Sequence, residues 1–76
     1  MDIKALTAEI KNEGIKDAAF LRSQGNERFD RNDSTASDEA EKAVREFTLS
    51  RGVKFTELTE AQQEELRESY YSGMEQ

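Results

Sequence analysis

Apolar residues recur at helical spacing in the second half of the chain. One stripe lies between Ser37, a residue type that caps helix N-termini, and Gly52, which can adopt the left-handed conformation that ends a helix. The stripe consists of Ala40, Ala43, Val44 and Phe47. A helix buries such a stripe against a neighbour, so this pattern predicts a helix over residues 37–51.

A second helix is predicted over residues 59–72. Thr59 and Gln62 have the spacing of a capping box, in which each side chain bonds the backbone of the other residue. Leu66 and Tyr70 share one face of this helix, and Gly73 is interpreted as its end. Residues 53–58 between the two helices alternate only loosely, which predicts a short extended connector without a sheet.

The first half of the chain has two glycines that we interpret as helix ends. Ile3, Leu6 and Ile10 form a narrow apolar stripe before Gly14, which predicts a helix over residues 2–13. Asp17 is interpreted as the cap of a shorter helix over 17–24, which ends at Gly25. Phe20 and Leu21 in this segment are about 100° apart on a helix, so they cannot both face one groove.

The predicted fold class is therefore all-α. We expect residues 1–76 to form a single small helical domain, a bundle of three to four short helices without significant sheet. Residues 25–36 form a polar connector that Phe29 is expected to pin to the core. Leu, Ile, Val and Phe make up less than one fifth of the chain, and a single core this small supplies only about 3–5 kcal/mol of stability.

The composition excludes several kinds of chemistry. Without cysteine or histidine, the chain has no disulfide, no usual ligand for structural zinc, and no Cys or His for catalysis. We expect no enzymatic activity and no cofactor. The first residues lack a secretory signal pattern, and no apolar run has the length of a membrane span. We therefore expect a cytoplasmic protein with no membrane association.

Negative charge is concentrated at the C-terminal end. The net charge is −6, and residues 57–76 contain six Glu and one Arg. Glu60, Glu64 and Glu68 recur every four residues on one helix face, and Arg67 and Tyr71 lie in or beside the same sector. This face is either a solvated acidic surface or a protein-binding surface with an aromatic anchor. Because acidic surfaces repel phosphate backbones, nucleic-acid binding is disfavoured.

The connector contains one spacing that resembles a known motif, the calcium loop of an EF-hand. Five oxygen-bearing residues stand at positions 1, 3, 5, 9 and 12 of a twelve-residue window: Asp30, Asn32, Ser34, Asp38 and Glu41. The resemblance implies a calcium site, but Thr35 stands where the family has its turn glycine. The alternative, which we favour, is a loop that caps the following helix.

These observations favour a small acidic, non-enzymatic module that binds a protein partner through its acidic C-terminal helix, as an accessory or inhibitor-like factor. The candidate protein-binding residues are Glu60, Glu64, Arg67, Glu68 and Tyr71. The main alternative is a homo-oligomeric structural protein that buries Leu49, Phe55 or Tyr71 between copies. A helix-turn-helix nucleic-acid binder is less favoured, because the six-residue connector is longer than the usual turn and the helix after it is acidic.

Overall fold

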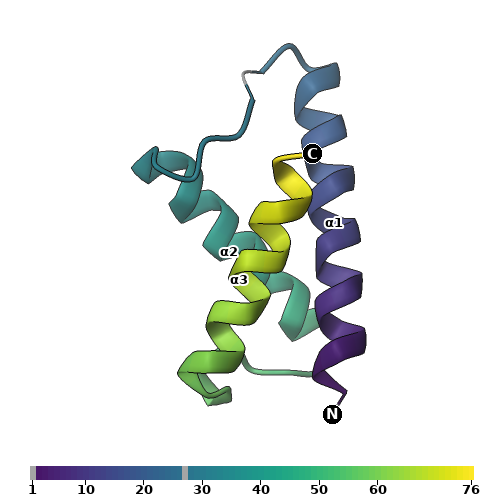
Figure 1. Ribbon diagram of the computed structural model, residues 1–76, viewed down its shortest axis with the longest axis vertical. Helices are drawn as coiled ribbons and strands as arrows, with labels where there is room; N and C mark the ends of the chain where they lie inside the picture. The colour runs from purple at the N-terminus through teal and green to yellow at the C-terminus, as the bar shows by residue number, and fades with distance from the viewer. Residues whose placement is uncertain (1, 27) are drawn as a thin grey trace.

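The computed structural model describes residues 2–26 and 28–76, and these residues form an all-α fold (Figure 1). In chain order the elements are α1 (Ile3–Ser23), α2 (Ser34–Ser50), a 3-10 turn η1 (Phe55–Glu57) and α3 (Glu60–Met74). The described residues contain no strand. The predicted fold class is confirmed, and the three α-helices in this part of the chain lie within the three to four predicted.

Helix α1 is continuous where the sequence predicted a break. The side chain of Asp2 caps it by accepting hydrogen bonds from the amides of Lys4 and Ala5. The helix then continues through Gly14, so the predicted segments 2–13 and 17–24 are one helix and Asp17 is not a cap. Gly14 is buried against α3, and this contact rather than a turn accounts for the glycine.

Gly25 and Gly52 end their helices as predicted. Their φ angles are 79° and 77°, in the left-handed region that glycine adopts without steric cost. After α2, the amide of Gly52 donates to Leu49 O at 2.9 Å and that of Val53 to Thr48 O at 2.9 Å. These two bonds are the Schellman arrangement, and they satisfy carbonyls that the helix end would leave unpaired.

Helix α2 begins three residues earlier than predicted, because its cap is Asp33. The Asp33 carboxylate accepts from the amides of Thr35 and Ala36, whereas Ser37 lies inside the helix and donates to Ser34 O. Aspartate at the N-cap also places a negative charge at the positive end of the helix dipole.

The connector between α2 and α3 is a 3-10 turn instead of an extended segment. Phe55 and Leu58 are buried, and the side-chain amide of Gln63 donates to the carbonyl oxygens of both. The predicted capping box of Thr59 and Gln62 is present. The predicted end at Gly73 is wrong, since α3 continues to Met74.

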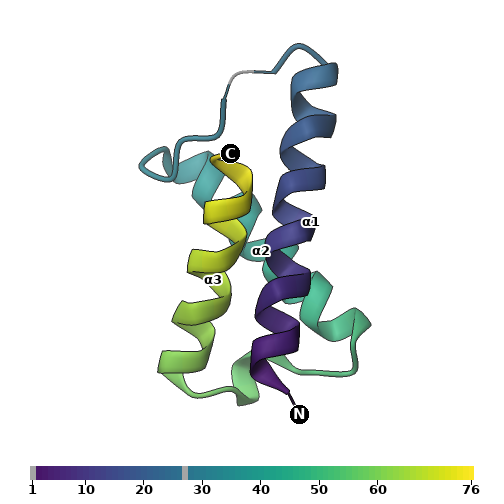
Figure 2. The same cartoon turned by 45° about the vertical axis from the view of Figure 1, so that its right-hand side comes forward.

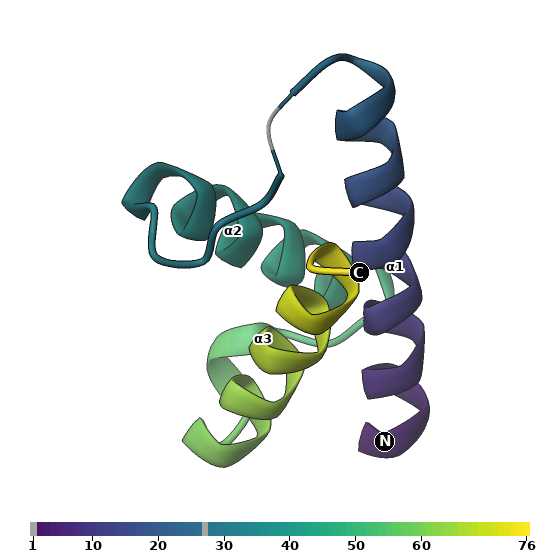
Figure 3. The same cartoon turned by 45° about the horizontal axis from the view of Figure 1, so that its top comes forward.

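Helices α1 and α3 lie side by side and run in the same direction (Figures 1 and 2). Helix α2 lies across them, and its N-terminal half extends away from α1 (Figure 3). Ile10, Val44 and Leu66, one from each helix, are fully buried at the centre of the core. The glycines Gly14 and Gly73 let the backbones of α1 and α3 approach closely, which places Tyr70 beside the middle of α1.

Candidate functional site

On the acidic face predicted for α3, the glutamates are exposed, whereas Arg67 and Tyr71 are partly buried. Glu60, Glu64 and Glu68 are exposed. Arg67 donates to Glu64 at 3.1 Å and to Glu41 of α2 at 3.2 Å, and its guanidinium lies 5.4 Å from the ring centroid of buried Phe55. Arg67 therefore joins α3 to α2 and covers part of the core.

Tyr71 is packed within the chain. It is half-buried, its ring centroid lies 5.5 Å from that of Phe29, and the Arg31 guanidinium lies 5.1 Å from the same ring. Burial, followed by the nearby Glu41 carboxylate, raises the pKa of the Tyr71 phenol. As predicted, Phe29 pins the connector to the rest of the molecule.

Arg31 connects the same connector to the end of α3. It donates to Glu68 at 2.8 Å and to both carboxylate oxygens of Glu75, at 3.0 and 2.6 Å. The hydrogen bonds to Glu75 and then Glu68 raise the pKa of the Arg31 guanidinium. The structure thus ties Arg67, Glu68 and Tyr71 to neighbouring elements, whereas Glu60 forms no ion pair with any described residue.

The residues with EF-hand spacing do not converge. The Asp30 carboxylate accepts from the amide of Asn32, and Glu41 pairs with Arg45 and Arg67. Among residues 2–26 and 28–76 there is no group of three or more Asp or Glu side chains placed to hold a metal ion. The connector instead supplies the cap of α2 through Asp33.

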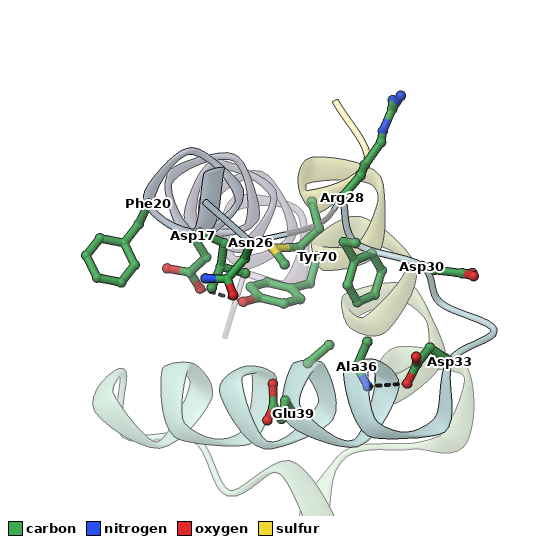
Figure 4. A pocket seen from close by; sticks show the side chains of 13 residues that line it. Asp17, Phe20, Asn26, Arg28, Asp30, Asp33, Ala36, Glu39 and Tyr70 are labelled. Atoms are coloured by element: carbon green, nitrogen blue, oxygen red, sulfur yellow. Dashed lines mark hydrogen bonds between the residues drawn. The ribbon is translucent and has the colours of Figure 1, made fainter. Parts of the chain in front are cut away.

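A cleft of about 480 Å³ opens between the C-terminal half of α1, the connector and the N-terminal half of α2 (Figure 4). The end of α3 forms its base, because Tyr70 and Met74 are both buried there. The other apolar lining residues come from all three remaining walls: Phe20, Leu21, Phe29, Ala36 and Ala40. Helix α2 extends away from α1 at this end of the molecule (Figure 3).

Charged residues surround the apolar base, and several are already engaged. Asp30 and Asp33 accept hydrogen bonds from backbone amides of the connector and α2. Arg28 points away from the cleft in Figure 4 and donates to the carbonyl oxygen of Glu75. The two remaining carboxylates, Asp17 on α1 and Glu39 on α2, form no ion pair with any residue in the described ranges.

Asp17 is held in place by Tyr70. The Tyr70 hydroxyl donates to the Asp17 carboxylate at 2.5 Å. Burial of the ring, then this hydrogen bond, and then the charges of Asp17 and Glu13 raise the pKa of Tyr70. At neutral pH the phenol therefore stays protonated, and it orients one oxygen of the Asp17 carboxylate at the wall of the cleft.

Sequence reasoning missed this cleft, because Asp17 and Tyr70 are separated by 53 positions. One local signal existed in the adjacent pair Phe20 and Leu21, which cannot share a groove. In the structure Leu21 is half-buried against the core, whereas Phe20 is 64% exposed at the edge of the cleft.

Comparison of the chain with protein-family models, with curated proteins and with solved structures gives no match. In residues 2–26 and 28–76, none of the helices combines the length and the apolar character that crossing a bilayer requires.

Proposed function

We propose that this protein is a non-enzymatic binding module that seats a segment of a partner protein in the cleft between α1, α2 and the connector. The observation that carries the proposal is an open cleft of about 480 Å³ with an apolar base and, on two opposite walls, carboxylates that form no ion pair with any described residue. Concave apolar sites with a few convergent polar groups are where proteins usually bind ligands.

A protein segment suits the cleft and its surroundings. Phe20, which is 64% exposed beside the opening, offers aromatic area that a partner surface could cover. The exposed Glu60 and Glu64 on α3 extend the acidic surface beyond the cleft, and the net charge of −6 would speed the approach of a basic partner. In this proposal the acidic helix α3 attracts the partner electrostatically, and the cleft replaces Tyr71 as the main site of contact with it.

A cleft-filling variant with a matched control tests the proposal. Ala36→Trp places a large ring in the cleft without changing charge, and Ala8→Trp adds the same ring on an exposed position of α1 outside it. A protein captured from host lysate by the wild-type chain is purified, and its Kd for each variant is measured by calorimetry. We expect Ala8→Trp to bind as the wild type does and Ala36→Trp to lose at least tenfold in affinity.

Equal affinity of the purified partner for both variants would contradict the cleft as the binding site. Absence of any partner that binds the wild-type chain directly would contradict the proposed function. Circular dichroism and urea unfolding of each variant confirm that a loss of binding does not come from unfolding.

Exposed apolar side chains favour a second candidate, a homo-oligomeric structural protein. Phe20 and Leu49 are 64% and 63% exposed, and each would be covered in an assembly of copies. Sedimentation equilibrium across a wide concentration range tests this candidate. A monomer at all concentrations counts against it, and an oligomer that Phe20→Ser or Leu49→Ser dissociates supports it.

A further inference from the structure

We infer that the cleft receives an arginine side chain of the partner, with its aliphatic stem against the apolar lining and its guanidinium between Asp17 and Glu39. The inference rests on the proposed function and specifies the chemistry of the segment that is bound. It follows from which lining groups are free, where they lie, and what each class of side chain would gain or lose there.

The charged side chains that face into the cleft are both negative. Asp30 and Arg28 point away from the cleft in Figure 4, and the Asp33 carboxylate caps α2. Asp17 and Glu39 remain, and in the described chain neither has a cation within ion-pair distance. An incoming cation would be the first positive charge beside them.

The two carboxylates lie on opposite walls. In Figure 4 Asp17 projects from α1 and is hydrogen-bonded to the Tyr70 hydroxyl, whereas Glu39 projects from α2, below the Tyr70 ring in this view. Tyr70 and Met74 are buried at the base, so a group that enters meets the two carboxylates and the apolar lining of the walls. Apolar lining with charge beside it matches a side chain that has an apolar stem and a cationic head.

Arginine fits this arrangement better than the other side chains. Its planar guanidinium has five N–H donors in a fixed fork, so it can bond two carboxylates at the same time. An acidic side chain would be repelled by Asp17 and Glu39. A purely apolar side chain would remove water from both carboxylates without replacing those hydrogen bonds, which is unfavourable.

The test uses a capped pentapeptide with one central arginine between alanines, and a twin in which citrulline replaces the arginine. Citrulline has the same shape and stem but carries no charge. Both peptides are titrated into the ¹⁵N-labelled full chain while amide shifts are recorded. We expect the arginine peptide to shift the amides of Asp17, Glu39 and Tyr70, and the citrulline peptide to bind at least tenfold more weakly.

Two variants of α2 localise the effect. Glu39→Gln removes one carboxylate of the cleft, and Glu46→Gln removes an exposed carboxylate of the same helix outside it. We expect Glu39→Gln to raise the Kd of the arginine peptide about fivefold and Glu46→Gln to leave it unchanged. Both positions are exposed, so neither change should unfold the helix.

The outcomes separate this inference from the proposed function. Equal binding of both peptides in the cleft would overturn the arginine inference and leave a protein-binding cleft in place. Shifts spread over α3 with equal effects of Glu39→Gln and Glu46→Gln would show general attraction to acidic surface and would also overturn it. No shift at the cleft with either peptide would contradict the arginine inference, while binding of the purified partner would still decide the function.

Discussion

Gly14 and Gly73 face each other across the contact between α1 and α3, where neither helix has room for a side chain. A Cβ on Gly14 would lie 2.4 Å from Tyr70 O and 3.3 Å from the Cα of Gly73. A Cβ on Gly73 would lie 2.2 Å from Lys11 O. Since the atoms that would clash belong to backbone, no side-chain rotation could relieve either contact.

Replacing either glycine by alanine should therefore destabilise the fold. Alanine is the better helix former by about 1 kcal/mol, but separating the two backbones should cost more than this gain. We expect a net loss of about 1–3 kcal/mol for Gly14→Ala and for Gly73→Ala, measured by urea unfolding. Asn12→Ala, at an exposed position of α1, is the control and should not lose stability. A stabilised Gly14→Ala would contradict the close backbone contact.

Asp33 and Ser37 provide a direct test of where α2 begins. Because the Asp33 carboxylate accepts from two free amides, Asp33→Ala should cost about 1 kcal/mol. Ser37 lies inside the helix, so Ser37→Ala should be neutral or slightly stabilising. Urea unfolding of both variants measures the difference, and the opposite order would place the start of α2 at Ser37.

The buried phenol of Tyr70 makes stability depend on pH in the alkaline range. Its pKa in the folded chain is raised above the unfolded value of about 10. Its contribution is therefore complete below about pH 10. Above that pH the unfolded state loses the proton first, and stability falls by up to about 1.4 kcal/mol per pH unit for this group.

Tyr70→Phe should remove this alkaline component, whereas Tyr71→Phe should retain it. Tyr70→Phe also loses the hydrogen bond to Asp17, which we expect to cost about 1 kcal/mol at neutral pH. Urea unfolding between pH 7 and pH 11.5 measures both effects. An alkaline decline of equal slope in Tyr70→Phe and the wild type would show that other groups cause it.

We expect the contacts of Arg31 to stabilise the attachment of the connector to α3. Arg31→Ala removes the contacts to Glu68, Glu75 and the Tyr71 ring together, and we expect a loss of about 1–2 kcal/mol. Arg31→Lys keeps the charge but not the forked geometry, so it should recover less than half of that loss. Hydrogen exchange should rise at residues 28–33 in both variants. Unchanged exchange there would contradict the role of Arg31.

The sequence predicted the structure best where that structure depends on residues that are close together in the sequence. The capping box at Thr59, the left-handed glycines and the apolar stripe around Val44 are local patterns, and the structure confirms the helices they indicated. Gly14 and Gly73 were wrongly predicted to end helices, because their role depends on a contact between segments far apart in the sequence. A glycine that ends a helix and a glycine that admits a neighbouring backbone look identical in one sequence, and only the packed partner distinguishes them.

The candidate site was harder to predict than the fold. The charge pattern located the exposed glutamates of α3, but it could not show that Arg67 would pair with Glu41 or that Phe29 and Arg31 would pack on Tyr71. The cleft depends on Asp17 and Tyr70, which meet only when α1 and α3 are docked. Long-range pairs of this kind leave no periodic signal along the chain.

The pairing of α1 with α3 has a consequence for how the chain reaches this fold. Their contact is the most extensive between helices, yet the whole of residues 24–59 separates them along the sequence. Closing that loop costs about 3 kcal/mol of chain entropy, and this cost precedes the favourable contacts between the two helices. We therefore expect the rate-limiting step of folding to be the docking of α1 against α3, and we expect α2 to pack against them afterwards. Mutations at the Gly14–Gly73 contact should then slow refolding, while those near Asp33 should mainly accelerate unfolding.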